Sequence, residues 1–244
     1  MDSFPTLAEV PLALLAGGRG TRLRGVADGV PKALIEVAGE PFIAHQLALL
    51  RRGGIMRVVL CIGHLGDQVE ACVGDGARFS LSVEYCREGE RLLGTAGALK
   101  QAASTLGRLF WVMYGDTYLD VDFGEILEAF RGSTALGLMT VFRNENRFDR
   151  SNVLFRDGRL LAYDKESPRP EMAHIDYGLA LLREEALGPV PPGEPYDLGD
   201  LYRAMAGRGL LQGFEIRRRF YEIGSPEGLA ETRRFFEPRR AQPA

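Results

Sequence analysis

The sequence has few of the residues that build metal cages and disulfide frameworks. It contains three cysteines and three histidines in 244 residues. Cys61, Cys72 and Cys86 form no C-x-x-C pair, and no histidine lies at metal-ligand spacing from another. Scattered thiols in odd number predict free cysteines in a reducing compartment and argue against disulfides or a zinc site. We therefore expect a cytoplasmic protein.

The chain also lacks a long apolar run and a strong excess of one charge. No stretch approaches the roughly 18 apolar residues of a membrane span, and the first residues lack the basic and apolar regions of a secretory signal. The net charge of -3 gives no electrostatic footprint for nucleic acid. We expect neither membrane nor nucleic acid as a partner. With 45% hydrophobic residues the chain can bury a sizeable core.

Short apolar runs alternate with helical patterns through the first half, whereas the second half holds strands separated by turns. This order predicts one α/β domain over residues 1–244, with 1–10 as an N-terminal extension and 237–244 as a frayed tail. The expected strands are 11–16, 56–62, 81–86, 109–114, 135–142, 152–155, 159–163, 177–182 and the extended run 213–221. The expected helices are 41–52, 64–73, 95–106, 197–207 and 226–236.

A glycine turn with cations, "LALLAGGRGTRLRG" at 12–25, follows the first expected strand. Its glycines let backbone N–H groups approach an anion, and Arg19, Thr21 and Arg22 add donors that suit phosphate oxygens. The P-loop pattern fails because no G-K-[ST] occurs. The dinucleotide pattern fails because Leu23 stands at the third glycine position. A plain connecting turn would explain the glycines but not the charge.

A second segment, "VPKALIEVAGEP" at 30–41, follows the glycine turn and carries Lys32. Residues 33–37 are expected to form a short strand that leads to a turn at Gly39. A lysine in such a segment is normally a solvated charge. Beside a glycine loop at the same edge of the sheet, a second phosphate contact is the better interpretation.

The patterns L-A-G-G-x-G-T-R-L and P-K-x-L-x-x-V-x-G-x-P together resemble the sugar-1-phosphate nucleotidylyltransferases. Similarity continues over about residues 10–235, through "LLGTAGALKQA" (92–102), "YGDTYLDVDF" (114–123), "YDKES" (163–167), "HIDYGLALL" (174–182) and "YEIGSPEGLAE" (221–231). The resemblance implies a Rossmann-like three-layer sandwich with a mostly parallel mixed central sheet. It also implies a reaction in which a sugar 1-phosphate attacks the α-phosphate of an NTP, with Mg²⁺ assisting.

The resemblance assigns roles to the charged residues of these motifs. It implies that Arg22 grips the triphosphate, Lys32 approaches the α-phosphate and Lys165 contacts the sugar phosphate. It implies Mg²⁺ ligands at Asp116 and at Glu222, where the family commonly has Asp. The structural alternatives are a turn-forming Asp116 and a turn contact for Glu222.

The resemblance also implies two sets of binding residues. The expected nucleotide-binding residues are Leu15, Ala16, Gly17, Gly18, Gly20, Thr21, Gly94 and Thr95. The expected sugar-binding residues are Gly97, Asp164, Asp176, Tyr177 and Gly178. Tight helix packing is the alternative for the small residues at 94–97, and a core position is the alternative for Tyr177. Asp164 stands where relatives often carry Glu.

The best expectation for the function is a D-glycero-D-manno-heptose or mannose 1-phosphate guanylyltransferase, making a nucleotide sugar for cell-surface polysaccharide. The alternatives are a uridylyl- or thymidylyltransferase on a hexose 1-phosphate, a cytidylyltransferase on a non-sugar phosphate, and a non-catalytic nucleotide-sugar-binding regulatory subunit. A homodimer is compatible with this resemblance. We expect no appended β-helical domain, because the chain ends soon after "EIGSPEGL".

Overall fold

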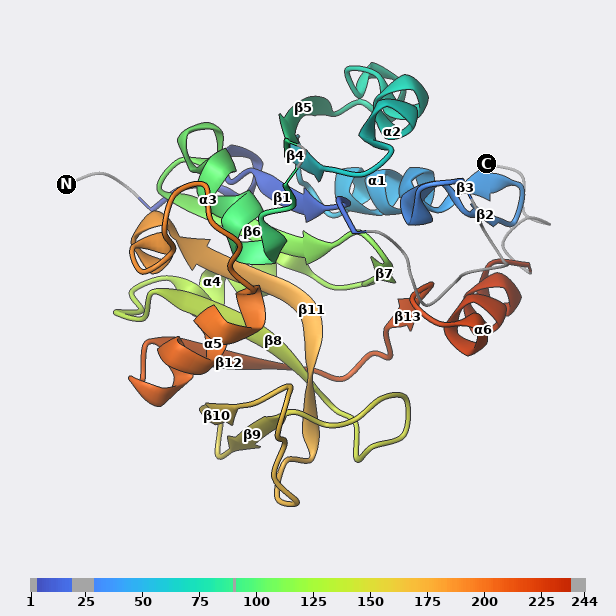
Figure 1. The fold of residues 1–244 in the computed structure, drawn as a ribbon. Helices are drawn as coiled ribbons and strands as arrows, with labels where there is room; N and C mark the ends of the chain where they lie inside the picture. Colours follow the sequence, from blue (N-terminus) through green and yellow to red (C-terminus); the bar gives the residue numbers. More distant parts are fainter. Residues whose placement is uncertain (1–3, 19–28, 90, 238–244) are drawn as a thin grey trace.

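The computed structural model describes residues 4–18, 29–89 and 91–237. These residues form a nine-stranded sheet with helices on both faces and two small two-stranded sheets beside it (Figure 1). None of the helices in these ranges is long and apolar enough to cross a bilayer. The predicted Rossmann-like α/β sandwich with a mostly parallel mixed sheet is confirmed.

The N-terminal half supplies the parallel part of the sheet. Strand β1 (Leu12–Leu15) lies between β4 (Arg57–Ile62) and β6 (Leu109–Tyr114), and β5 (Ser82–Arg87) follows β4 at the edge. All of these pairs are parallel. Nearly every residue of β1, β4 and β6 is buried because helices cover both faces, which explains their almost unbroken apolar sequences. Their carboxyl ends meet at one edge of the sheet.

The second half adds the mixed part of the sheet. The long strand β11 (His174–Arg183) pairs antiparallel with β6 and with β8 (Gly137–Arg143), and β12 (Leu211–Ile216) pairs parallel with β8. Strands β9 (Val153–Arg156) and β10 (Arg159–Tyr163) form the predicted hairpin at the bottom of Figure 1. Its turn residues Asp157 and Gly158 both have positive φ, as the Asp-Gly pair predicts.

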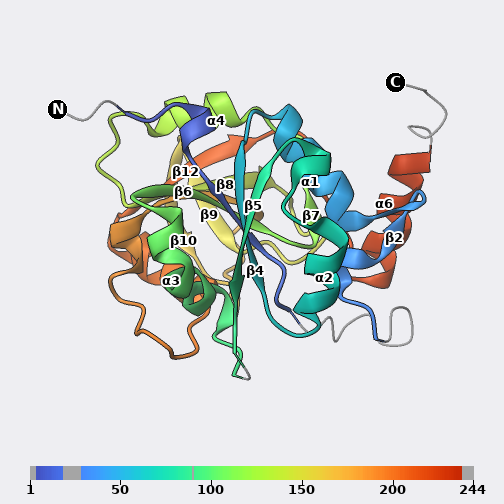
Figure 2. The ribbon, with the colours of Figure 1, turned by 90° about the horizontal axis from the view of Figure 1, so that it is seen from above.

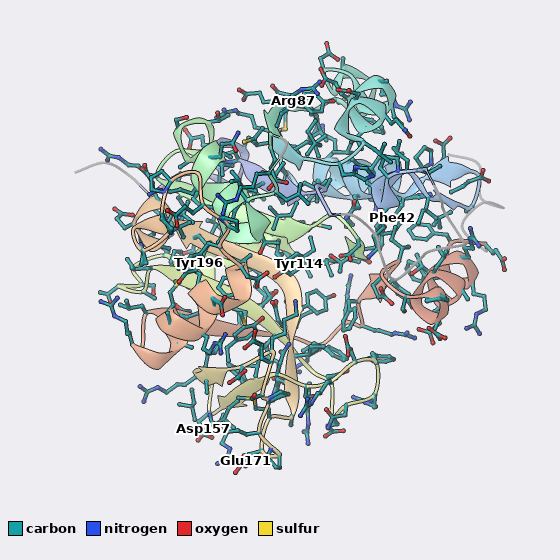
Figure 3. All side chains as sticks on the ribbon, viewed as in Figure 1. Phe42, Arg87, Tyr114, Asp157, Glu171 and Tyr196 are labelled. Carbon is teal, nitrogen blue, oxygen red and sulfur yellow. The ribbon has the colours of Figure 1, made fainter. Side chains whose placement is uncertain are left out.

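Two hydrophobic cores lie on opposite faces of the sheet. Helices α1 (Phe42–Arg52), α2 (Gly66–Val73) and α4 (Phe123–Phe130) pack into one core, with Leu12 and Leu14 of β1. Helices α3 (Gly94–Leu106) and α5 (Leu198–Gly207) pack into the other, with Ala13. Figure 2 shows α3 and the α1–α2 pair on opposite sides of β4 and β5. Figure 3 shows the side chains that fill both layers.

A third, smaller core holds the C-terminal helix α6 (Pro226–Phe236) beside α1. Phe236 of α6 packs with Val37 of β2 (Glu36–Val37), with Phe42 of α1 and with Ile223. Strand β2 forms a small hairpin with β3 (Glu40–Pro41). Strand β13 (Tyr221–Glu222) pairs antiparallel with β7 (Thr117–Tyr118), which follows β6. The end of the chain is thereby brought to the carboxyl end of β6.

Several expected elements need correction. The sequence interpretation omitted α4, and the strand expected at 33–37 is wrong for its first half. Residues Lys32–Leu34 form a 3-10 turn, in which the N–H of Leu34 donates to the Pro31 carbonyl at 2.8 Å, so only Glu36–Val37 pair as a strand. The extended run 213–221 is split between β12 and β13.

The expected N-terminal extension is described by the structure from residue 4 onward. Residues Leu7–Glu9 form a 3-10 turn, and the partly buried side chains of Phe4 and Leu7 pack on the larger core. Residues 4–10, the described part of the extension, therefore pack against the domain. The frayed tail expected at 237–244 lies almost wholly outside the described residues. All three cysteines are free thiols, as predicted, and Cys61 is buried.

Candidate active site

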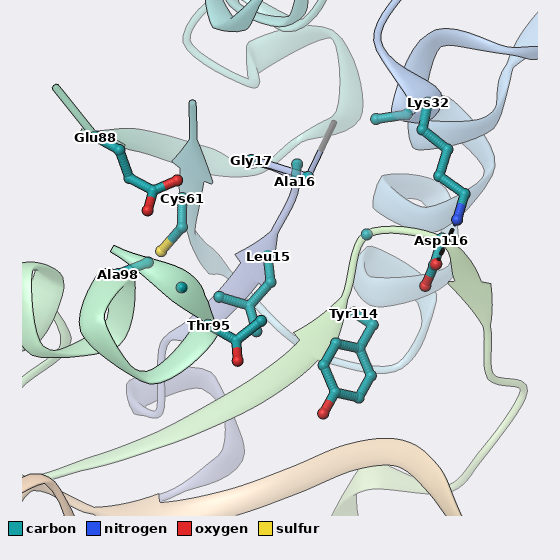
Figure 4. A pocket seen from close by; sticks show the side chains of 14 residues that line it. Leu15, Ala16, Gly17, Lys32, Cys61, Glu88, Thr95, Ala98, Tyr114 and Asp116 are labelled. Atoms are coloured by element: carbon teal, nitrogen blue, oxygen red, sulfur yellow. Dashed lines mark hydrogen bonds and ion pairs between the residues drawn. The ribbon is translucent and has the colours of Figure 1, made fainter. Parts of the chain in front are cut away.

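A cavity of about 270 Å³ opens at the carboxyl ends of the parallel strands. Parallel α/β sheets bind ligands at this edge, and the glycine turn led us to expect a site here. Segments from β1, β4 and β6 and from the start of α3 surround the cavity (Figure 4). Its lining residues are Leu15, Ala16, Gly17, Gly18, Lys32, Ala33, Cys61, Glu88, Gly94, Thr95, Ala98, Tyr114, Gly115 and Asp116.

Two of the glycines are needed because backbone and side chains approach them closely. A Cβ atom at Gly17 would lie 2.6 Å from a carboxylate oxygen of Glu88. A Cβ atom at Gly115 would lie 2.6 Å from the carbonyl oxygen of Leu15. A larger residue at Gly115 would push the ends of β1 and β6 apart, and one at Gly17 would displace the Glu88 carboxylate that lines the cavity. The approach of the Gly17 backbone to a bound nucleotide stays a prediction, and in this structure the group next to Gly17 is the Glu88 carboxylate.

An ion pair between Lys32 and Asp116 lies on the wall of this cavity (Figure 4). The Lys32 Nζ donates to Oδ2 of Asp116 at 2.7 Å, and the two side chains are 16% and 29% exposed. The buried Gln46 amide of α1 donates to the carbonyls of Tyr114 and Thr117, at 3.1 and 2.7 Å. These bonds fix the turn that carries Asp116. Lys32 and Asp116, 84 positions apart, thus meet, and Asp116 Oδ1 makes no hydrogen bond to a side chain in the described parts of the chain.

Glu222 reaches the same place from the end of the chain. It lies opposite Thr117 in the β13–β7 pair, and the N–H of Ile223 donates to the Asp116 carbonyl at 2.9 Å. A Cβ atom at the next residue, Gly224, would lie 3.1 Å from Lys32 Nζ and 3.4 Å from Asp116 Oδ2. The structure therefore gathers three of the predicted catalytic and metal residues around one point.

A second cavity, of about 520 Å³, adjoins the first, and the two share Tyr114 and Asp116. It contains three of the five predicted sugar-binding residues together with Glu222. Its remaining wall mixes aromatic residues with charges of both signs: the Arg219 guanidinium lies 4.0 Å from the ring centre of Phe148 and pairs with Glu231. The lining residues are Tyr114, Asp116, Thr117, Arg147, Phe148, Asp149, Ile175, Asp176, Tyr177, Gly178, Arg219, Phe220, Tyr221, Glu222, Ser225, Glu227, Gly228 and Glu231.

The Asp176 carboxyl faces this second cavity from a distortion in β11. The register of β11 on β8 shifts between Asp176 and Ala180, where Gly178 has a φ of 97°. The N–H of Gly178 donates to Oδ1 of Asp176 at 2.9 Å. Burial raises the pKa of Asp176 to about 6, although the Gly178 N–H, the charge of Lys165 and the Tyr114 hydroxyl all lower it. Lys165 therefore acts electrostatically on this cavity.

The other predicted binding residues have mixed outcomes. For Gly97 the structure favours tight helix packing over sugar binding as the reason for glycine, because a Cβ atom there would lie 2.9 Å from the Glu194 carbonyl oxygen. Asp164 accepts hydrogen bonds from the N–H groups of Glu166 and Ser167, so its carboxylate organises its own loop. Tyr177 is 1% exposed and belongs to the core while also forming cavity wall. Gly20, Thr21 and Arg22 lie outside the described residues.

The sequence interpretation missed Glu88 and Tyr114. The Glu88 carboxylate lies next to Gly17 in the wall of the first cavity, and its other oxygen accepts from the Leu93 N–H at 2.7 Å. Burial raises the pKa of Glu88, and that hydrogen bond opposes the shift. No local pattern marks either residue: Glu88 lies in a charged loop, and Tyr114 ends an apolar strand. Glu88 and Tyr114 are recognisable as site residues only in the folded chain, which brings both next to the glycine turn.

Asp116 and Glu222 fit a magnesium site. Mg²⁺ prefers carboxylate oxygens and usually takes one or two protein ligands, with substrate phosphates and waters completing the shell. The described part of the chain contains no cluster of three or more His, Cys, Asp or Glu side chains suited to a closed protein cage. Two adjacent carboxylates at the junction of two cavities match the open arrangement.

Comparison with known proteins decides the family. Residues 13–151 match the family model described as nucleotidyl transferase, which is more than half of the chain. The chain belongs to the nucleotidyl transferase family. The matched region begins in β1 and includes the glycine turn, Lys32 and Asp116.

Curated relatives of this nucleotidyl transferase act on different sugars. A Synechocystis UTP–glucose-1-phosphate uridylyltransferase is 29% identical over 81% of this chain and 55% of its own length. An N-acetylmuramate α-1-phosphate uridylyltransferase of Neisseria meningitidis is 40% identical over 45% of this chain and 48% of its length. A Mycobacterium tuberculosis mannose-1-phosphate guanylyltransferase is 27% identical over 90% and 62%. The chain thus spans about half to three-fifths of these relatives.

Solved structures share the fold. HddC from Yersinia pseudotuberculosis matches with a TM-score of 0.79 and 22% identity, over 93% of this chain and all of that one. A putative glucose-1-phosphate thymidylyltransferase from Bacillus anthracis matches with a TM-score of 0.82 and 20% identity, over 96% of both chains. At such identities the likeness supports the fold and leaves the substrates open.

Proposed function

We propose that this nucleotidyl transferase moves a nucleotidyl group from an NTP to a sugar 1-phosphate. The observation that carries the proposal is that two cavities meet at Asp116, beside Lys32. The glycine-lined cavity would take the NTP, and the larger cavity would take the sugar phosphate. An oxygen of the sugar phosphate attacks the α-phosphorus, the bond to the β-phosphate oxygen breaks, and pyrophosphate leaves.

Such a transfer needs positioning and charge neutralisation more than covalent chemistry. Lys32 would neutralise the α-phosphate in this proposal, which its position at the cavity wall and its bond to Asp116 support. We propose Arg22 as the triphosphate contact and Lys165 as the sugar-phosphate contact. The Lys165 charge already influences Asp176 in the larger cavity.

We propose Mg²⁺ as the cofactor, held by Asp116 and Glu222. The ion would neutralise phosphate charge that Lys32 alone leaves unbalanced. Asp116 uses one oxygen for Lys32, and each oxygen of Glu222 has lone pairs beyond its bond to Ser225 or Gly224. The carboxylates can therefore bind the ion without giving up these hydrogen bonds.

The donor base and the acceptor sugar define two candidate activities. We propose guanylyl transfer to heptose or mannose 1-phosphate as the first, in a cytoplasmic route to cell-surface polysaccharide. The 40% identity to the Neisseria uridylyltransferase favours a second candidate, uridylyl transfer to an N-acetylated sugar 1-phosphate. The experiment that distinguishes these two candidates also detects thymidylyl transfer, cytidylyl transfer or a regulatory role without catalysis.

The test is pyrophosphate release with Mg²⁺, using GTP, UTP, dTTP and CTP against a panel of sugar 1-phosphates. The panel contains mannose, heptose, glucose and N-acetylmuramate 1-phosphates, with phosphocholine as the non-sugar acceptor. We expect one pair to exceed the others, and we expect Asp116→Ala to abolish its turnover. If the chain binds a nucleotide sugar but turns over none of the pairs, it is a regulatory subunit and not an enzyme.

A further inference from the structure

Glu222 has an unusual setting at the start of α6. Its carboxylate turns back from β13 toward the helix, where Oε1 accepts from the Ser225 hydroxyl at 2.6 Å and Oε2 accepts from the Gly224 N–H. Ser225 is the N-cap of α6, and its Oγ also accepts from the Gly228 N–H at 3.0 Å. The positive end of the helix dipole favours a carboxylate here.

The space for this carboxylate comes from Gly228, in the first turn of α6. A Cβ atom at Gly228 would overlap the Glu222 Oε1 and Cδ atoms and lie 3.0 Å from Cγ. Rotation of the Glu222 carboxylate alone does not relieve that overlap, because it moves only the two oxygens and leaves the overlapping Cδ atom in place. The end of the Glu222 side chain therefore occupies the space that a side chain at Gly228 would need.

The backbone gives no other reason for glycine at this position. Gly228 lies inside a helix and is not among the residues with positive φ, so an L-residue could adopt its conformation. Glycine within a helix costs about 1 kcal/mol relative to alanine. Gly228 weakens the helix although its backbone conformation does not require glycine. The reason for glycine here is therefore steric.

One helical turn further, Thr232 holds the backbone of Glu222. Its hydroxyl donates to the Glu222 carbonyl at 2.7 Å, and the residue is fully buried. One face of α6 thus fixes both the main chain and the side chain of Glu222. Asp116 is tied to the same segment by the bond from the Ile223 N–H.

We propose that Gly228 is a positioning residue, whose absent side chain admits the long arm of Glu222 and keeps its carboxylate beside Asp116 and Lys32. Ser225 fixes the direction of that arm. An aspartate at 222 is one methylene shorter and needs less of this space. The consequence for metal binding rests on the proposed function, whereas the steric pairing of Glu222 with Gly228 does not.

The first test is a thermal unfolding cycle in the presence of a chelator. Gly228→Ala is made in the wild-type, Glu222→Asp and Glu222→Ala backgrounds. Gly207→Ala in α5 is the matched control, because a Cβ atom there would meet nothing within 4 Å. We expect the control to raise the Tm, since alanine is the better helix former.

We expect Gly228→Ala to lower the Tm in the wild type and to raise it, like the control, once Glu222→Ala has emptied the space. The Glu222→Asp background should give an intermediate shift. A rise in Tm in all three backgrounds, or a fall in all three, overturns the proposal. This readout needs neither substrate nor metal.

The second test measures Mn²⁺ affinity by paramagnetic resonance, with Mn²⁺ as a probe for the Mg²⁺ site. Residues that orient metal ligands typically change metal affinity by roughly tenfold to a hundredfold. We expect a loss of that size for Gly228→Ala and its recovery when Glu222→Asp is added. Equal loss in the double variant overturns the positioning role. If the wild type binds no Mn²⁺ and turns over no substrate, the proposed function fails, and the unfolding cycle still decides the pairing.

Discussion

Replacing Asp176 by asparagine should make the protein less sensitive to rising pH. The Asp176 carboxyl is enclosed at the wall of the larger cavity, where burial raises its pKa from 3.8 to about 6. Asparagine keeps the size of the side chain and an oxygen that can accept from the Gly178 N–H. The substitution therefore removes the charge while leaving the local bond in place.

The sign and size of the effect follow from proton linkage. Because the pKa is higher in the folded state, folding is favoured by the protonated carboxyl, and this advantage is lost as the pH rises through about 6. A shift of roughly two units at 1.36 kcal/mol each gives about 3 kcal/mol. This is an upper bound, because part of Asp176 is exposed to the cavity.

The assay is urea unfolding of both proteins between about pH 4 and about pH 8, the window in which the linked proton is released. The free energy of unfolding of the wild type, relative to Asp176→Asn, should fall by up to about 3 kcal/mol across this range. Asp157→Asn is the control, because this exposed turn residue has a φ of 51° that asparagine tolerates. A difference that does not change with pH would refute a buried, charged Asp176.

Four further substitutions probe the first cavity. Lys32→Ala and Asp116→Ala should each lower kcat by about 100-fold or more with an unchanged circular dichroism spectrum, because both lie at the cavity and outside the core; near-normal turnover of Asp116→Ala would remove it from the metal site. Gly17→Ala should weaken NTP binding about tenfold in calorimetry, since its Cβ would lie 2.6 Å from a Glu88 oxygen; unchanged affinity would mean that Glu88 moves away. Glu88→Gln should alter the ratio of kcat/KM between NTPs about tenfold, because a carboxylate only accepts hydrogen bonds and an amide also donates; equal losses for every NTP would place Glu88 away from the base.

The sequence predicted the sheet well because burial on both faces leaves a clear record. Strands such as β6, "LFWVMY", are apolar at nearly every position, and glycine or polar residues end them. The omitted helix α4 also had a readable signal. Asp122 caps it by accepting from the Glu125 N–H, and its buried residues follow at i, i+3, i+4 and i+7 from Phe123 to Phe130. The start of this stretch overlaps the motif at 114–123 that contains Asp116. Because these residues were assigned to the motif, the helix was not predicted.

Site residues could be predicted where the residue type and a local motif indicate a role. They could not be predicted where the role depends on contact with a residue far away in the sequence. Lys32 and Asp116 could each be proposed from their motifs, but an ion pair across 84 residues follows only from the fold. Gly97 resembles a ligand contact in sequence, whereas the segment at Glu194 explains it in the structure. The carbonyl of Glu194 is 97 positions away, and no local pattern connects the two residues.

Glu222 shows why a departure from a motif cannot be judged at one position. Taken alone, glutamate in place of aspartate moves a carboxylate by one methylene and suggests a weakened metal ligand. Gly228, taken alone, is a poor helix residue near a helix start. In the structure each explains the other, because the longer side chain occupies the space that the glycine leaves. Glu222 and Gly228 therefore form one steric unit, in which the face of α6 leaves room for the longer carboxylate near Asp116.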